Sequence, residues 1–239
     1  MSEFKPHEIE WNDNFVSRLW DFYGSAGGME KLYFSKHSGH HLIRRIARDV
    51  KFAGRILDYG CGPGHLINTI IQRTEDGMVH GLDFSEDSVR ATEERLRGNA
   101  QFGGVVSVKQ LPSGYEDGYF DVIVAVEVIE HLNDDYLDGL LNEVTRLLKP
   151  GGRVVFTTPN SEDLGSKKTM CPECGCIFHR WQHVRSWTPE TLRSLLARHG
   201  FLVEKVRQTC FGSVARRVWY FVNRKPPHLY VVGVKAESA

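Results

Sequence analysis

A glycine-rich turn between two apolar segments constrains the fold of this chain more than any other feature. Residues 56–66 read Ile-Leu-Asp-Tyr-Gly-Cys-Gly-Pro-Gly-His-Leu, so an apolar segment leads into an acidic residue, three alternating glycines and a second apolar segment. Gly60, Gly62 and Gly64 allow the backbone to turn sharply and to approach a ligand closely. The pattern therefore predicts a buried strand, a ligand-binding turn and a helix, in that order.

The spacing of these glycines differs from that of a dinucleotide-binding loop. Such a loop carries Gly-x-Gly-x-x-Gly, whereas here position 65 is His and Pro63 stiffens the turn. Asp58 precedes the turn and offers a carboxylate to an amino group of the ligand. We therefore expect a cationic nucleoside that carries an amino acid, rather than a pyrophosphate.

Strand and helix patterns alternate along the rest of the chain, which predicts an α/β fold with helices on both faces of a parallel sheet. Ser85, Asn133 and Thr188 are expected N-caps, and Ser38 is expected to cap an earlier helix. We expect a doubly wound, seven-stranded, mostly parallel sheet. Its strands are predicted at residues 55–59, 78–83, 105–109, 120–126, 153–158, 201–207 and 229–234, and helices at 65–73, 86–97, 134–148 and from 189 onward.

The expected domain organisation is a helical N-terminal cap over residues 1–50 and one α/β domain over residues 51–239. Two stretches interrupt the alternation. Residues 160–187 are rich in Cys and His, and residues 210–227 are basic and aromatic. The second stretch is expected either to pack on the edge of the sheet, to touch a membrane surface, or to hold an anionic substrate.

Five segments of the chain carry a resemblance to a known family. They are residues 57–64, 81–85, 119–123, 127–131 and 148–153. In order and spacing they resemble the class I S-adenosylmethionine-dependent methyltransferases. The resemblance implies a Rossmann-like fold, S-adenosylmethionine as the methyl donor, and a helical cap that lies over the cofactor.

The resemblance also implies which residues bind the cofactor. Asp83, at the end of the second strand, is expected to accept the ribose hydroxyls, although an acid there could instead stabilise a helix N-terminus. Phe84 is expected beside the adenine, together with the loop after the third strand. The full expected set is Asp58, Gly60, Cys61, Gly62, Gly64, Asp83, Phe84, Gln110, Leu111 and Glu127.

Glu127, Glu130 and His131 follow the fourth strand and are the expected catalytic residues. A neutral His can remove a proton from a hydroxyl acceptor, or two carboxylates and a His can hold Mg²⁺ or Mn²⁺. The segment is similar to those of ubiquinone-biosynthesis O-methyltransferases and of small-RNA 3′-terminal 2′-O-methyltransferases. In the second group the metal takes a further His, which His183 matches. A helix-capping Glu130 with a structural His131 is the alternative.

A cysteine cluster predicts a second metal site. Cys-x₂-Cys followed by spaced His is a zinc-binding pattern because the turn aims two thiolates at one tetrahedral centre. We expect a structural zinc with four ligands drawn from Cys171, Cys174, Cys176, His179 and His183. The alternative is a reduced loop without metal.

Charge and composition limit the partners. Lys+Arg and Asp+Glu both number 30 in the 239-residue chain, so no global charge attracts nucleic acid or a membrane. Residues 162–225 nevertheless hold 12 Lys/Arg against five Asp/Glu. No apolar run is long enough to span a membrane, no signal segment opens the chain, and the five cysteines suit a reducing, cytoplasmic setting.

Together these features predict a biosynthetic methyltransferase that acts on a hydroxyl of a small molecule, and the local basic excess is compatible with an anionic one. Three other functions stay open. They are metal-dependent 2′-O-methylation of RNA, methylation of a nitrogen or of a sugar intermediate, and cofactor binding without turnover.

Overall fold

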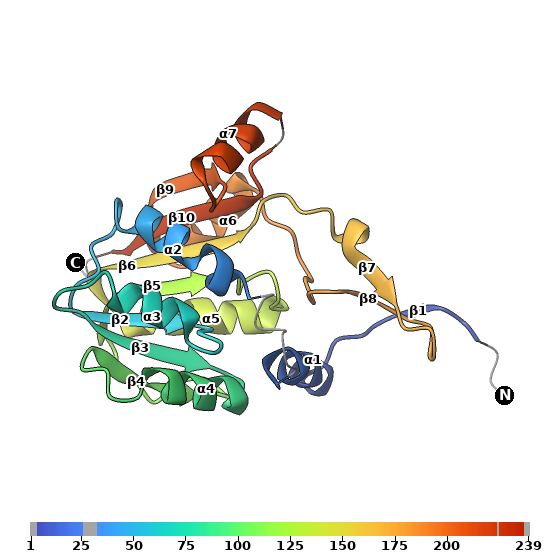
Figure 1. Ribbon diagram of the computed structural model, residues 1–239, viewed down its shortest axis with the longest axis horizontal. Coiled ribbons are helices and arrows are strands. Elements are labelled where there is room, and N and C mark those ends of the chain that lie inside the picture. Colours follow the sequence, from blue (N-terminus) through green and yellow to red (C-terminus); the bar gives the residue numbers. More distant parts are fainter. Residues whose placement is uncertain (1–3, 26–32, 224, 237–239) are drawn as a thin grey trace.

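The computed structural model describes residues 4–25, 33–223 and 225–236. Its centre is a seven-stranded sheet in the order β4-β3-β2-β5-β6-β10-β9, in which β10 runs antiparallel to both of its neighbours (Figure 1). This is the predicted doubly wound, mostly parallel sheet. The strands are β2 (Arg55–Tyr59), β3 (Met78–Asp83), β4 (Phe102–Ser107), β5 (Phe120–Val126), β6 (Leu148–Pro159), β9 (Phe201–Thr209) and β10 (His228–Lys235).

Two apolar layers cover the sheet because its strands are buried on both faces. In β10, Leu229 and Val231 pack into one layer, while Tyr230 and Val232 pack into the other. The first layer is built with α5 (Asp134–Leu147) and α6 (Pro189–Arg198). The second is built with α2 (Phe34–Ile46), α3 (His65–Ile71) and α4 (Glu86–Leu96).

Most local sequence signals have the expected effect. Ser85, Asn133 and Thr188 each accept a hydrogen bond from a backbone N–H of the first turn of the next helix. The third predicted strand is displaced, since β4 occupies residues 102–107 rather than 105–109. The prediction for Ser38 is wrong: the helix already begins at Phe34, and Ser38 is buried inside it beside residues that pack on the sheet.

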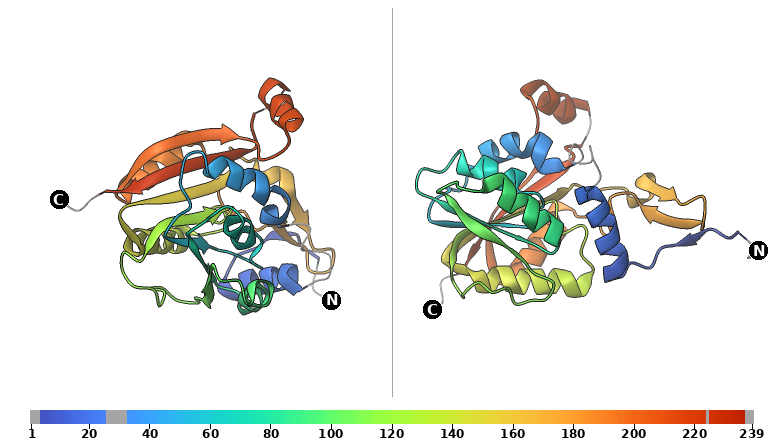
Figure 2. Two further views of the ribbon diagram at one scale, coloured as in Figure 1. Left: turned by 60° about the vertical axis from the view of Figure 1, so that its left-hand side comes forward. Right: turned by 60° about the horizontal axis from the view of Figure 1, so that its bottom comes forward.

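The expected cap contains two helices with different surroundings. Leu42, Ile43 and Ile46 of α2 are fully buried in the core. By contrast, α1 (Asp13–Ser25) lies across the carboxyl edge of the sheet, between the main body and a separate hairpin (Figure 2). It contacts α5 through Asp13, whose carboxylate accepts a hydrogen bond from the Tyr136 hydroxyl at 2.6 Å.

The separate hairpin belongs to a small second sheet in the order β1-β8-β7. Its strands are β1 (His7–Glu8), β7 (Lys168–Met170) and β8 (Cys176–His179), and a 3₁₀ helix, Leu164–Lys167, leads into β7. This sheet projects away from the main body on the far side of α1 (Figures 1 and 2). Its hairpin, residues 168–179, lies within the Cys- and His-rich stretch predicted at residues 160–187.

The basic aromatic stretch forms α7 (Val214–Asn223), which projects from the molecule between β9 and β10 (Figure 1). Val214, Val218, Phe221 and Val222 lie on one helical face and are exposed, Phe221 to 85%. The expectation that this segment packs on the sheet edge is therefore wrong for that face. In the described part of the chain, no helix combines the length and the apolarity that crossing a membrane requires.

Candidate active site

The glycine turn is held down by the strands and the helix around it. The backbone N–H of Gly60 donates to Leu82 O at 2.7 Å, and Thr92 Oγ1 of α4 donates to Gly62 O at 2.8 Å. All three glycines have positive φ, and a Cβ on Gly60 would lie 2.7 Å from Val128 Cγ2. The turn therefore needs glycine both for its backbone conformation and for close packing.

Asp58 lies at the end of β2 with 1% of its surface exposed. Neither of its carboxylate oxygens has a hydrogen-bond partner among the described residues. Burial, with a smaller contribution from Asp83, raises the pKa of Asp58 to about 8. A buried carboxylate without a partner is costly unless a ligand supplies one, so Asp58 suits the amino group of a bound amino acid.

Asp83 holds the loop in place at the end of β3. Its Oδ2 accepts the Gly62 N–H at 2.8 Å and its Oδ1 accepts the Ser85 N–H at 2.9 Å. Burial raises the pKa of this carboxyl, while the hydrogen bonds from Ser85 and Gly62 oppose the shift. Each oxygen retains a second lone pair, so the carboxylate can also accept the ribose hydroxyls of a nucleoside.

The other expected cofactor residues differ in how far their side chains are buried. The Cys61 side chain is buried in the core, and burial raises the pKa of its thiol, so Cys61 offers a ligand only its backbone. Phe84 is 39% exposed directly after β3, as a residue beside a base would be. Leu111 faces α5, where a Cβ on Gly139 would lie 3.3 Å from Leu111 Cδ1, and Gln110 is exposed.

Glu127 has a strained backbone at the end of β5. Its φ of 54° is unusual for a residue other than glycine, and such strain concentrates at functional sites. Its Oε2 lies 3.4 Å from His228 Nδ1 of β10, and its Oε1 is buried without a partner among the described residues. Glu127 therefore faces β10, and among the described residues it is not part of the potential metal-ligand group that follows.

Glu130, His131 and His183 form a compact cluster that could hold a metal ion. One potential ligand atom from each residue lies within 4.8 Å of the others. Glu130 is 1% exposed, and only its Oε2 is paired, with Thr158 Oγ1 at 3.1 Å. Glu130 Oε1 and His131 Nδ1 are buried without partners among the described residues.

The electrostatics of this cluster favour a cation. Burial, then the nearby Glu127, raises the pKa of Glu130 well above its usual range. Burial, then the neighbouring His183, lowers the pKa of His131 to about 3. A positive ion bound between them would offset the effect on Glu130, because it stabilises the carboxylate, and the neutral imidazole of His131 has a lone pair to offer it.

Glu162, which the sequence analysis did not select, completes the surroundings of His183. Its Oε2 pairs with His183 Nδ1 and its Oε1 lies 3.8 Å from His179 Nε2, so these three residues form a second potential ligand group. Burial alone would raise the pKa of Glu162, but hydrogen bonds from His183 and Lys167 bring it to about 2. Its place directly after β6, at the carboxyl edge of the sheet, is the signal that could have identified it.

A comparison with protein families identifies the family to which the chain belongs. The family model described as "Methyltransferase domain" matches residues 37–206. The chain belongs to this methyltransferase family. The matched region holds the glycine turn, Asp58, Asp83 and the Glu130–His131–His183 cluster, and the donor of the family is S-adenosylmethionine.

Curated relatives of this methyltransferase include O-methyltransferases. The ubiquinone biosynthesis O-methyltransferase of Methylococcus capsulatus is 34% identical over 159 residues, which are 64% of this chain and 61% of the relative. That of Vibrio parahaemolyticus is 26% identical over 65% of this chain and 63% of its own length. The chain thus spans about three fifths of these relatives. An uncharacterized methyltransferase of Geobacillus kaustophilus is 26% identical over 87% of this chain and 97% of its own.

Solved structures confirm the fold. A chain from the complex of the Haloferax volcanii Trm112 methyltransferase activator with a methyltransferase superposes with a TM-score of 0.68 at 19% identity, covering 91% of this chain and 98% of its own. A phosphoethanolamine N-methyltransferase of Haemonchus contortus, solved with S-adenosylmethionine, gives 0.66 at 17% identity, covering 92% and 60%. These superpositions show that the chain has a Rossmann-like fold.

The structure does not assemble the zinc ligands that the sequence pattern predicts. His179 and His183 lie with Glu162, and in the described ranges no cysteine joins a potential metal-ligand group within 4.8 Å. The reason is the strand β8, which contains both Cys176 and His179. Side chains three residues apart on a strand point to opposite faces and are separated by about 10 Å along it. A set that combines the cysteines with His179 and His183 is therefore wrong.

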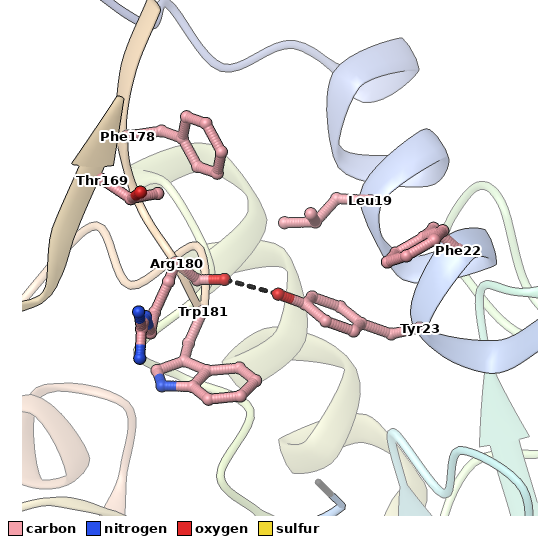
Figure 3. Close-up of a pocket in the computed structure, with 7 residues that line it drawn as sticks. All are labelled: Leu19, Phe22, Tyr23, Thr169, Phe178, Arg180 and Trp181. Atoms are coloured by element: carbon pink, nitrogen blue, oxygen red, sulfur yellow. Dashed lines mark hydrogen bonds between the residues drawn. The ribbon is translucent and has the colours of Figure 1, made fainter. Parts of the chain in front are cut away.

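An aromatic pocket opens between α1 and the hairpin (Figure 3). It has a volume of about 380 Å³ and is closed on one side by a hydrogen bond from the Tyr23 hydroxyl to Arg180 O at 2.8 Å. Gln182 connects this region to the cluster, since its side chain accepts from Trp20 Nε1 and donates to His131 O. The lining residues are Leu19, Phe22, Tyr23, Thr169, Phe178, Arg180 and Trp181.

Proposed function

We propose that this methyltransferase methylates a hydroxyl oxygen of a small molecule, with a divalent cation held by Glu130, His131 and His183. The observation that carries the proposal is the buried Glu130 Oε1, which has no hydrogen-bond partner among the described residues, in a group of three potential ligands with His131 and His183. Buried polar atoms are normally paired, and Glu130 Oε1 lies 3.9 Å from His131 Nε2, so a cation bound between these two atoms would pair the carboxylate oxygen. When bound, such a cation lowers the pKa of a coordinated hydroxyl.

The position of His131 supports a ligand role over a general-base role. An efficient base has a pKa near the working pH, whereas burial and His183 hold the pKa of His131 at about 3. The neutral imidazole can still donate a lone pair to a metal. A set of two imidazoles and one carboxylate suits Mn²⁺ or Zn²⁺ better than Mg²⁺, which prefers oxygen ligands.

The residues around the cluster have distinct roles in this proposal. Asp58 binds the amino group of S-adenosylmethionine and Asp83 binds the ribose. Because Gly60 has no side chain, the backbone there can approach the nucleoside closely. Glu162 accepts from His183 Nδ1 and so leaves Nε2 as the metal-binding nitrogen. Trp20 and Gln182 exclude water from His131 while the acceptor hydroxyl is aligned with the methyl group.

The pocket beside α1 supports a small, partly apolar acceptor. Its volume of about 380 Å³ falls in the range of small-molecule sites. Phe178, Trp181 and Tyr23 supply ring faces, and Arg180 supplies a cation that would pair with an acidic group of the acceptor. The curated relatives named ubiquinone biosynthesis O-methyltransferases are consistent with an acceptor of this kind.

RNA 2′-O-methylation is the second candidate, because the inclusion of His183 in the cluster also fits the RNA-modifying subgroup. The equal numbers of acidic and basic residues weigh against an RNA substrate. Methylation of nitrogen would not need a metal to activate the acceptor. A subunit that only binds the cofactor would need neither the cluster nor the pocket.

The decisive experiment transfers a radiolabelled methyl group from S-adenosylmethionine into an extract of the cells that make the protein. Separation into soluble metabolites, lipids, RNA and protein then reports the acceptor class. Label in metabolites or lipids supports the proposal, and label in RNA overturns it in favour of the second candidate. Label in protein alone, or no transfer by a chain that binds the cofactor, also contradicts it.

A metal-depletion experiment tests the cluster. We expect EDTA to abolish transfer and Mn²⁺ to restore it, whereas His131→Ala and His183→Ala should bind the cofactor normally and resist restoration. His199→Ala, which changes a histidine that pairs with Asp138 on the surface, is the control. Full activity in EDTA would exclude the cation.

A further inference from the structure

The turn between β7 and β8 gathers three thiols that the active site does not use. Its sequence, residues 171–176, is Cys-Pro-Glu-Cys-Gly-Cys, and we call it the cysteine turn. The Gly175 N–H donates to Cys171 O at 2.9 Å, and Gly175 has a φ of 76°. This hydrogen bond joins the first and fifth residues of the turn and so closes the backbone around Cys171 and Cys174.

Backbone donors already point at one of these sulfurs. The N–H groups of Cys174 and Glu173 and the Cys174 thiol hydrogen-bond to the Cys171 sulfur. These contacts bring the side chains of Cys171 and Cys174 together.

The register of the small sheet adds Cys176 and a histidine to the same place. Cys176 is the partner of His7 in the parallel pairing of β1 with β8, and Cys171 N donates to Cys176 O at 2.8 Å across the hairpin. Residues that are directly opposite on neighbouring strands project from the same face of a sheet. His7, Cys176 and Cys171 therefore form a row on one face, next to Cys174 at the turn.

The N-terminal segment approaches the cysteine turn closely. His7 N donates to Gly175 O at 3.0 Å, and a Cβ on Gly175 would lie 3.0 Å from Lys5 O. The His7 ring makes a single long contact, from Nδ1 to Lys5 O at 3.3 Å. Rotation of this exposed ring about its side-chain bonds would turn it toward the thiols.

We propose that Cys171, Cys174, Cys176 and His7, whose ligand atoms do not all lie within 4.8 Å of one another in this structure, close around one structural Zn²⁺ as a tetrahedral Cys₃His site. Zinc commonly takes this donor set in closed structural sites. His7, which precedes the cysteine turn by more than 160 residues, replaces the histidines that the linear spacing suggested. The site shares no ligand with the Glu130–His131–His183 cluster, so it stands independently of the proposed reaction.

The small sheet requires a stabilising contact between β1 and the hairpin beyond its own packing. Its strands have two, three and four residues, and both residues of β1 are exposed, so burial of apolar surface contributes little to holding β1 in place. Zinc would join β1 to the hairpin that carries Phe178 and His179. Because α1 follows β1 along the chain, the ion would also fix the position of α1 over the active site.

The test measures zinc and cobalt binding in the purified full-length chain under reducing conditions. We expect zinc that survives dialysis against a weak chelator. Replacement by Co²⁺ should produce a thiolate-to-cobalt charge-transfer band, which an imidazole and carboxylate site cannot produce, so the active-site cluster does not interfere. Cys174→Ser should lose the band, and Cys210→Ser, a buried cysteine far along the sequence in the β9–β10 connection, should keep it.

Two substitutions of His7 decide whether it is the fourth ligand. His7→Ala should weaken metal binding by more than about 100-fold, the upper end of the effect of losing an outer-shell partner, while His40→Ala on α2 should not. His7→Cys should retain the metal and strengthen the band from three thiolates to four. A wild-type chain without a thiolate band overturns the site, and His7 variants that bind like the wild type overturn the assignment of His7.

Discussion

Trp20 of α1 packs edge-on against His131, with ring centroids 4.9 Å apart and an interplanar angle of 86°. The two residues are joined a second time through Gln182, whose side chain accepts from Trp20 Nε1 at 2.9 Å and donates to His131 O at 2.7 Å. Gln182 is 2% exposed and has a φ of 58°. One amide thus connects the helix over the site to the cluster below it.

This link predicts that Gln182→Ala affects the acceptor more than the cofactor. Loss of both hydrogen bonds should free α1 from the cluster and reduce kcat/KM about tenfold, equivalent to ~1.4 kcal/mol. The dissociation constant of S-adenosylmethionine should change by less than about twofold. Steady-state kinetics and calorimetric titration measure the two quantities. Gln101→Ala, which removes a surface amide near Thr74, is the matched control, and equal losses in both variants would refute the link.

Asp58 predicts a stability that depends on pH. Its pKa of about 8 in the folded chain lies above the ordinary 3.8, so protonation favours the folded state. The contribution of Asp58 to stability is full below about pH 3.8 and is lost as the pH rises toward 8. We therefore expect Asp58→Asn to be more stable than the wild type at pH 8, by about 1–3 kcal/mol, with little difference at pH 4.

The same substitution should weaken binding of S-adenosylmethionine by at least about tenfold, because the amide cannot form an ion pair with the amino group. Denaturant unfolding across this pH range and calorimetry test the two effects together. An Asp58→Asn chain that is less stable at pH 8, or that binds the cofactor normally, would show that Asp58 has a purely structural partner.

Gly60 predicts a steric effect that can be separated from backbone strain. Gly60 and Gly98 have nearly equal φ values, 76° and 77°, but a Cβ meets Val128 at 2.7 Å in the first and nothing within 4 Å in the second. Both alanine variants should lose about 1–2 kcal/mol from the left-handed backbone. Gly60→Ala should lose about 1–3 kcal/mol more from overpacking.

Chemical denaturation compares these two variants directly. The additional substitution Val128→Ala should recover part of the loss in Gly60→Ala and none of the loss in Gly98→Ala. Equal destabilisation of the two single variants would mean that the turn relaxes around the new methyl group.

The hydrogen bond between Glu162 and His183 predicts that Glu162 affects metal affinity indirectly. Glu162→Gln leaves His183 in place but weakens the hydrogen bond that orients its ring. Affinity for Mn²⁺ should fall by about 10–100-fold, as expected for an outer-shell partner of a metal-binding histidine. Activity against Mn²⁺ concentration measures the change. Glu204→Gln removes an exposed partner of Arg153 and should leave the curve unchanged; an unchanged curve for Glu162→Gln as well would exclude the positioning role.

The sequence alone was sufficient to predict the strands and helix caps that are determined by residues close together along the chain. The bounds of β2, β3 and β5 agree with the prediction, because long apolar runs between an acidic end and a turn specify buried parallel strands. The three confirmed caps need only a side chain and the next turn of the same helix. Ser38 fails because its surroundings are set by packing of α2 on the core, which overrides a local preference for capping.

The grouping of Asp58, the glycines and Asp83 also followed from sequence, since they come from the ends of two adjacent strands. The order of parallel strands in a doubly wound sheet brings such ends together. Glu162 and Gln182 escaped notice because their roles depend on side chains from other elements. Gln182 lies in the loop between β8 and α6, and this loop has no periodic sequence pattern from which its position could be predicted.

The sequence by itself determined the fold, the methyl donor of the family and the grouping of Asp58 and Asp83 at the glycine turn, because these depend on periodicity and on motifs contiguous along the chain. Only the tertiary structure decided which histidines lie beside Glu162 and which histidine lies on the same face as the cysteines. Alternation along β8 places His179 with Glu162 and His183, while the pairing of β1 with β8 places His7 beside the cysteines. The physical reason is that metal and acceptor sites depend on distances between side chains, and strand register and helix packing set those distances.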